Sequence, residues 1–174
     1  YWAKLQKELI EKGKVTDSIS ILENNKLKDS VFEILEVIKD HNMILATGHL
    51  SKEETFAIVK VAADLNVKVV ITHPNFPSID FTKEEQKELA DMGAYMEHCY
   101  TTPHTNKISW EALFEQIRYV GPEHCILSTD LGQPTAVYPD EGLIDFATQL
   151  YRNGFSEDEI KRMSIHNPTL LVES

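Results

Sequence analysis

Histidine and acidic side chains follow several short apolar segments of this chain, at positions where they could bind a metal ion. His49 and His73 each come at the end of one such segment, and Asp130 comes at the end of another. Neutral imidazole and carboxylate groups are the usual ligands of zinc and similar divalent ions. A catalytic metal site also needs an open position for water and a carboxylate near that water. The pattern therefore predicts that His49, His73 and Asp130 are metal ligands.

Other histidines are weaker candidates for the same site. His98 also ends an apolar segment, but the adjacent Glu97 must point to the opposite side of the same strand. His104 is expected to face the substrate or to be exposed. Each of these residues alone also suits an ordinary structural role, so the metal site depends on the whole set. We expect the remaining histidines to be solvated groups near helix ends or a strand start: His41, His124 and His166.

The candidate ligands can meet only if the segments that precede them are neighbouring strands of one sheet. Short, mostly apolar segments are typical of strands that are buried on both faces of a parallel sheet. Parallel strands bring their carboxyl ends to one edge, where α/β proteins place their binding sites. The expected strands are 43–47, 67–72, 94–97 and 125–129, with a weaker strand at 18–22.

Amphipathic segments with helix start signals lie between the expected strands. Capping boxes begin at Ser51, Thr82 and Ser156, where side chain and backbone satisfy each other's open polar groups. Ser109 and Asp29 are expected to be N-caps of two further helices. Another helix is expected over about 141–153, and a short one after 167–168. This alternation of strands and helices predicts βαβ units and a parallel sheet.

The spacing of the strands is compatible with two α/β architectures. Strands start near residues 43, 67, 93 and 125, so one unit takes about 27 residues. An open, doubly wound sheet fits within this length. A closed eight-stranded barrel needs about 250 residues. The spacing alone does not separate the two.

Four short motifs make the chain resemble the second half of an amidohydrolase-superfamily barrel. They are Thr47-Gly48-His49, Thr72-His73-Pro74, Ser128-Thr129-Asp130 and the segment 166–171. The resemblance covers residues 40–174. It implies an α/β fold of the (β/α)8 TIM-barrel type, of which this chain holds about strands 4 to 8 with their helices.

The same resemblance implies a function and a cofactor. His49 and His73 would bind a divalent metal, zinc first of all, with manganese or iron as alternatives. Asp130 would bind the metal as well and act as general base toward the hydrolytic water. The implied enzyme is a metal-dependent hydrolase that cleaves an amide, ester or related C–N or C–O bond of a small molecule.

The chain departs from the superfamily pattern in its first part. No His-x-His pair occurs, although the superfamily's first strand usually carries one, and Glu23 is the only candidate for the metal-bridging residue of strand four. We expect residues 1–174 to be one hydrolase-like domain that lacks its N-terminal strands and opens within a helix over 2–12. An upstream segment or a second copy in a homo-oligomer would then cover the open sheet edge, which proteins rarely leave exposed.

Two loops beyond the expected strand ends are the places where a substrate would be recognised. They are the Thr- and Pro-containing segment 100–107 and the segment 131–140. The candidate substrate-binding residues in them are Tyr100, His104, Gln133 and Tyr138. Both segments also suit ordinary surface loops.

The composition excludes several classes of protein. Seventeen Lys and Arg residues stand against 28 Asp and Glu residues, a net charge of −11, which argues against a nucleic-acid partner. The 42% apolar content excludes a disordered chain, and no apolar run approaches the about 18 residues that a membrane span needs. Two cysteines are too few for a disulfide framework, which favours a reducing, cytoplasmic location.

Alternative functions belong to other classes. A non-catalytic partial barrel could bind a metal, a small molecule or a protein partner, and the missing His-x-His pair favours it. A nucleotide-binding domain is disfavoured because the chain has no glycine-rich turn between strand and helix. A metal-dependent nuclease is disfavoured by the net charge.

Overall fold

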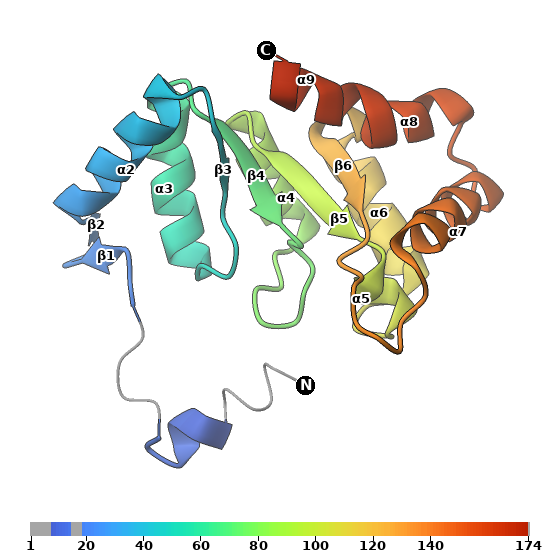
Figure 1. The fold of residues 1–174 in the computed structure, drawn as a ribbon, viewed down its shortest axis with the longest axis horizontal. Coiled ribbons are helices and arrows are strands. Elements are labelled where there is room, and N and C mark those ends of the chain that lie inside the picture. Colours follow the sequence, from blue (N-terminus) through green and yellow to red (C-terminus); the bar gives the residue numbers. More distant parts are fainter. Residues whose placement is uncertain (1–7, 15–18, 174) are drawn as a thin grey trace.

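Four parallel strands form the centre of the protein. The computed structural model describes residues 8–14 and 19–173. In these residues, each central strand pairs with the next strand along the chain, so the sheet order follows the sequence (Figure 1). The strands are β3 (Ile44–Ala46), β4 (Lys68–Thr72), β5 (Tyr95–Cys99) and β6 (Cys125–Ser128). This arrangement confirms the four expected strands and the α/β class.

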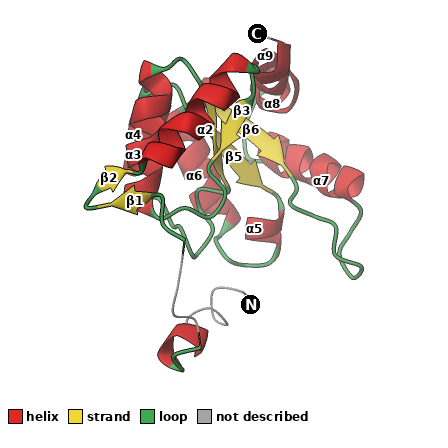
Figure 2. Cartoon of the chain, turned by 60° about the vertical axis from the view of Figure 1, so that its left-hand side comes forward, coloured by secondary structure: helices red, strands yellow, loops and turns green. Residues whose placement is uncertain are grey.

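Helices alternate with these strands and continue after the last one, as Figure 2 shows. They are α2 (Asp29–Asp40), α3 (Lys52–Asp64), α4 (Lys83–Asp91), α5 (Thr101–His104), α6 (Trp110–Val120), α7 (Pro139–Arg152), α8 (Glu157–Lys161) and α9 (Asn167–Glu173). A 3₁₀ turn at Pro122–His124 precedes β6, and a π-helical turn at Arg162–His166 joins α8 to α9.

Local capping chemistry explains where several of these helices begin. The capping boxes expected at Ser51, Thr82 and Ser156 are all present, and the Ser109 hydroxyl accepts a hydrogen bond from a backbone amide of α6. The expected Asp29 cap is wrong by one residue. Asp29 is the first residue inside α2, where its negative charge favours the positive end of the helix dipole.

The expected weak parallel strand over 18–22 is wrong: of its described residues only Leu22 is in a strand, and that strand belongs to a short hairpin. The antiparallel strands β1 (Leu22–Glu23) and β2 (Lys26–Leu27) lie outside the four-stranded sheet. Asn24 and Asn25 connect them with φ angles of 50° and 60°. Two consecutive positive φ angles are typical of a tight hairpin turn, and asparagine tolerates them well. Glu23 therefore does not lie on the parallel sheet.

The N-terminal helix expected over 2–12 is described only in part. Residues 8–11 are helical, whereas residues 1–7 lie outside the described part of the chain. Of the expected strand 18–22, residue 18 also lies outside it.

Apolar side chains on one face of the sheet pack against the helices, and this contact holds the sheet in place. Val69, Ile71, Met96 and Leu127 belong to a single apolar cluster with buried residues of the helices, such as Phe146. Helices α4 and α6 pack against each other behind the sheet (Figure 1). Side chains alternate along a strand, so the residues between these apolar ones point to the other face.

Cys99 and Cys125 are both buried and unpaired, and they lie at opposite ends of the neighbouring strands β5 and β6, as expected for parallel order.

Among the helices of the described residues, none combines the length and the apolar character needed to cross a membrane.

Glu54 ties the segment before the hairpin to the first turn of α3. One carboxylate oxygen accepts hydrogen bonds from the Ser20 hydroxyl (2.6 Å) and the Ile21 amide (3.0 Å). The other accepts from the amide (3.0 Å) and the hydroxyl (2.9 Å) of Ser51. Burial alone would raise the pKa of Glu54, but these hydrogen bonds outweigh burial and lower the pKa to about 2.

Because these hydrogen bonds need the ionised carboxylate of Glu54, the protein is expected to lose stability at low pH. The folded-state pKa of Glu54 lies below the ordinary value of 4.5, so its stabilisation is present above pH 4.5 and is lost as the pH falls toward 2. We expect Glu54→Gln to lower the free energy of unfolding by about 1–3 kcal/mol at pH 7, because charge-assisted hydrogen bonds are lost. Urea unfolding between pH 7 and pH 3 measures both effects.

The adjacent Glu53 supplies the matched control. It lies in the same helical turn but is exposed, so Glu53→Gln should change the stability by less than about 0.5 kcal/mol at any pH. A difference between Glu54→Gln and wild type that stays constant down to pH 3 would contradict the proposed role of the Glu54 charge.

Candidate metal site

The carboxyl ends of β3 and β4 are fastened to each other, which brings two histidines together. The Thr72 amide donates to the Thr47 hydroxyl (3.2 Å), and the Gly48 amide donates to the Thr72 hydroxyl (3.1 Å). Gly48 has a φ of 58°, a left-handed angle that glycine adopts without strain and that turns the chain toward His49. His73 follows Thr72 directly, so both imidazoles emerge from this one fastened edge.

His49 and His73 face each other through their Nε2 atoms. These atoms lie 3.2 Å apart, and the two rings are nearly perpendicular, at 89°. His73 is only 5% exposed, whereas His49 is exposed. His73 also has a φ of 31°, which is unusual for a residue other than glycine and is typical of strained functional positions.

The surroundings of His73, burial above all, favour its neutral form. Burial lowers the pKa of His73, and the charges of His49 and Lys107 lower it further, while its backbone interaction and the charge of Asp130 act in the opposite direction. A neutral imidazole has a free lone pair on one ring nitrogen, which is the form that binds metal ions. The Nδ1 atom of His73 is buried without a hydrogen-bond partner within the described residues.

Asp130 lies beyond the end of β6 and close enough to His73 to affect its pKa. Its side chain is exposed and its φ is 51°. The Thr101 hydroxyl lies 2.8 Å from the carbonyl oxygen of Thr129 and 2.9 Å from that of Asp130, and donates to this turn. Residues 8–14 and 19–173 nevertheless contain no group of three or more His, Cys, Asp or Glu residues arranged to hold a metal ion. The structure thus brings His49 and His73 together, and Asp130 near them without completing a set of three ligands.

The structure corrects the expectation for His98. It lies opposite Leu127 in the register of β5 and β6 and shares the face of Leu127 and Met96, both in the core cluster. The ring is completely buried and burial lowers the pKa of His98 to about 3. Within the described residues neither ring nitrogen of His98 has a hydrogen-bond partner, so no hydrogen bond joins it to His49 or His73.

Glu97 lies on the face of β5 opposite to Met96 and His98, together with Tyr95 and Cys99. Burial raises the pKa of Glu97; the Ser128 hydroxyl acts against this, and the charge of Asp130 adds to it. Glu97 and Asp130 are therefore close enough for the charge of Asp130 to act on Glu97. The alternation of side chains along residues 95–99 could have indicated this orientation from the sequence.

Cys99 shares that face but is not suited to be a nucleophile. Burial raises the pKa of Cys99 to about 12, so the thiol stays protonated. Its sulfur lies 3.2 Å from the Ser128 hydroxyl.

The four expected substrate-binding residues have different surroundings. Tyr100 is only 3% exposed and packs against Trp110 and Phe146, with its hydroxyl donating to Asp145 (2.8 Å). It belongs to the core, so the expectation that it faces a substrate is wrong. His104 is exposed and stacks on the Tyr100 ring, with centroids 4.7 Å apart. The other two, Gln133 and Tyr138, are exposed on the loop before α7.

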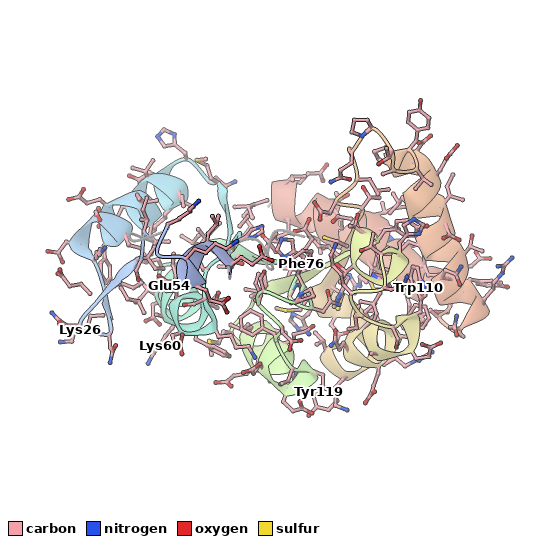
Figure 3. All side chains as sticks on the ribbon, turned by 90° about the horizontal axis from the view of Figure 1, so that it is seen from below. Lys26, Glu54, Lys60, Phe76, Trp110 and Tyr119 are labelled. Atoms are coloured by element: carbon pink, nitrogen blue, oxygen red, sulfur yellow. The ribbon has the colours of Figure 1, made fainter. Side chains whose placement is uncertain are left out.

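Two residues that the sequence did not single out lie next to the histidine pair. The ring of Phe76 is 5.0 Å from that of His73 and 6.4 Å from that of His49, between ring centroids. The ammonium group of Lys107 lies over the same Phe76 ring, 4.7 Å from its centroid. Figure 3 shows Phe76 near the middle of the molecule in the view from below.

An open cleft begins at His49 and runs along the start of α3 toward the hairpin. Its volume is about 1030 Å³, and its lining is largely polar, with Ser51, Glu53, Ser78 and Asn24 among its residues. The exposed side of the histidine pair therefore borders a space that can admit a small molecule.

Comparison with known proteins places the chain in a family. No curated protein matches the chain. A family described as "Family of unknown function (DUF6282)" matches residues 3–97, more than half of the chain, and this match includes His49 and His73. The chain belongs to the DUF6282 family.

Proposed function

We propose that the chain is part of a metal-dependent hydrolase that acts on a small molecule. His49, His73 and Asp130 would hold a divalent metal, with zinc as the first candidate. The bond cleaved would be an amide, ester or related C–N or C–O bond. The observation that carries the proposal is the 3.2 Å separation of the two Nε2 atoms.

That separation fits two ligands of one metal ion. With zinc–nitrogen distances of about 2.0–2.1 Å and a tetrahedral angle, two imidazole nitrogens lie about 3.3 Å apart. The pair in the protein agrees with this value to about 0.1 Å. The proposal further requires that the exposed Asp130 carboxylate reaches the pair when the metal binds.

The architecture supports the proposal at the level of the fold. We infer that β3 to β6 correspond to strands five to eight of a (β/α)8 barrel, since they are parallel, consecutive and separated by helices. In such barrels the catalytic residues come from the carboxyl ends of several strands. His49, His73 and Asp130 all follow strand ends in this way.

Each residue of the candidate site would have a separate role in hydrolysis. A bound divalent cation lowers the pKa of a water molecule from about 15.7 toward 7 and polarises the scissile carbonyl. Asp130 would accept the proton of that water and later deliver it to the leaving group. His49 and His73 would remain neutral ligands throughout, and Phe76 would limit access of bulk water to the buried side of the pair.

Metal analysis combined with a hydrolysis assay tests the proposal. The chain is purified without chelator, loaded separately with zinc, manganese or iron, and assayed against a panel of small amides and esters. We expect about one equivalent of metal per chain and metal-dependent turnover of at least one compound. Less than about 0.1 equivalent of every metal would contradict the proposal and favour a non-catalytic partial barrel.

A further inference from the structure

Lys107 is held in place beside the histidine pair by a series of hydrogen bonds that starts at β6. The Thr101 hydroxyl donates to the turn that carries Asp130. The Thr105 hydroxyl then donates to the Thr101 carbonyl (2.6 Å), and the Lys107 ammonium donates to the Thr105 hydroxyl (3.1 Å). The Lys107 amide also donates to the Thr102 carbonyl (3.0 Å). Hydrogen bonds thus connect both the backbone and the side chain of Lys107 to the turn that carries Asp130.

The ammonium group lies near the candidate metal site. It lies 4.7 Å from the Phe76 ring centroid, which in turn lies 5.0 Å from the centroid of His73, so the ammonium is within about 10 Å of the His73 ring. Lys107 also contributes to the lowered pKa of His73. An ammonium has three donors, and Thr105 accepts from one of them.

Several other surface lysines are neutralised by carboxylates, whereas Lys107, in the part of the chain that the structure describes, is not. Lys52, Lys83 and Lys87 each pair with a carboxylate. Lys107 takes part in none of the ion pairs found within the described residues. In a chain with a net charge of −11, a fixed cation whose neighbours are an aromatic ring and a hydroxyl is available to bind an anion.

We infer that Lys107 binds an anionic group, a carboxylate or a phosphate, of the substrate whose scissile bond lies at His49 and His73. This inference rests on the proposed hydrolase function and adds a substrate class to it, namely small anionic molecules. Lys107 would determine specificity rather than carry out chemistry. Its distance from His73 suits a molecule whose anionic group lies a few carbon atoms from the reacting bond.

Titrations of the whole 174-residue chain, followed by ¹H–¹⁵N NMR, test the inference with and without zinc. The probes are glutarate, inorganic phosphate and the neutral diamide glutaramide. We expect one of the anions to bind at least about tenfold more tightly than glutaramide, as a charge-assisted hydrogen bond implies. Glutarate as the tighter anion would identify carboxylate substrates, and phosphate would identify phosphorylated ones.

Two substitutions of Lys107 and one control make the test specific. Lys107→Met keeps an unbranched apolar side chain one atom shorter than lysine and should remove the tenfold preference, whereas Lys107→Arg should keep it within about threefold. Lys60→Met removes a positive charge from α3, at a distance from Phe76 in Figure 3, and should leave the preference unchanged.

The outcomes separate this inference from the proposed function. Equal binding of anions by wild type and Lys107→Met, or no preference for either anion in wild type, would overturn the inference. Absence of metal binding would contradict the hydrolase, but the NMR titrations without zinc would still report whether Lys107 selects anions.

Discussion

Replacing Asp130 with asparagine is expected to lower kcat/KM for hydrolysis by about a thousandfold. General-base catalysis contributes about 10²–10⁴-fold, and an amide can neither take up the proton nor match a carboxylate as a metal ligand. The measurement is the initial rate of the metal-loaded variant on any compound that the wild-type chain hydrolyses. Turnover at the wild-type rate would remove Asp130 from the role of base.

The same substitution should leave the fold intact, which makes the loss of rate interpretable. Asp130 has a φ of 51°, and asparagine is among the residues that tolerate this left-handed region best. We expect the melting temperature of Asp130→Asn to stay within about 2 °C of wild type. Asp80 provides a matched control, because it is exposed and has the same φ of 51°. Asp80→Asn removes the same charge from the same backbone conformation and should retain full activity.

The parts of the fold that depend on neighbouring residues could be predicted from the sequence. The capping boxes at Ser51, Thr82 and Ser156 each need only a hydroxyl and a glutamate three residues later, so their pattern is visible in the chain. The four parallel strands could be predicted as well, because each one lies on a short, mostly apolar segment that is visible in the chain. The hairpin of β1 and β2 was missed because strands of two residues have no periodicity to detect.

The meeting of His49 and His73 was predictable because topology decides it. Neighbouring parallel strands end at the same edge, so residues just after them must lie close together. The direction of single side chains was harder to predict. Tyr100 lies beyond a strand end like the site residues, but two aromatic residues, Trp110 of α6 and Phe146 of α7, pack against its ring and place it in the core. Whether a residue just after a strand joins the core or the candidate site depends on how segments distant in the sequence pack around it.

Lys107 could not be recognised from the sequence, since nothing in segment 100–107 distinguishes it from an exposed lysine. Its position depends on hydrogen bonds of Thr101 and Thr105 and on the Phe76 ring, which comes from a loop after a different strand. A cation next to the histidine pair is therefore a property of the tertiary structure.

Removing either histidine of the pair is expected to reduce the bound zinc from about one equivalent to below about 0.1. Each substitution leaves one imidazole and one carboxylate, too few for the three protein ligands of a catalytic zinc site. His73→Asn is the better choice at that position, because asparagine accepts the φ of 31° without the strain that alanine would meet. His49→Ala suits the other position, which is exposed. Metal content is measured after dialysis, by mass spectrometry.

Thermal unfolding gives an independent measurement of the same prediction. Zinc at 100 times its dissociation constant should stabilise the wild-type chain by about 2.7 kcal/mol, which raises the melting temperature by about 5–10 °C for a domain of this size. Neither His49→Ala nor His73→Asn should show this shift, whereas His41→Ala, at the exposed end of α2, should show all of it. If the two rings are held together by a hydrogen bond alone, zinc should raise the melting temperature of none of these chains, wild type included. The zinc-dependent shift in wild type thus separates two metal ligands from a pair of hydrogen-bonded histidines with the same 3.2 Å separation.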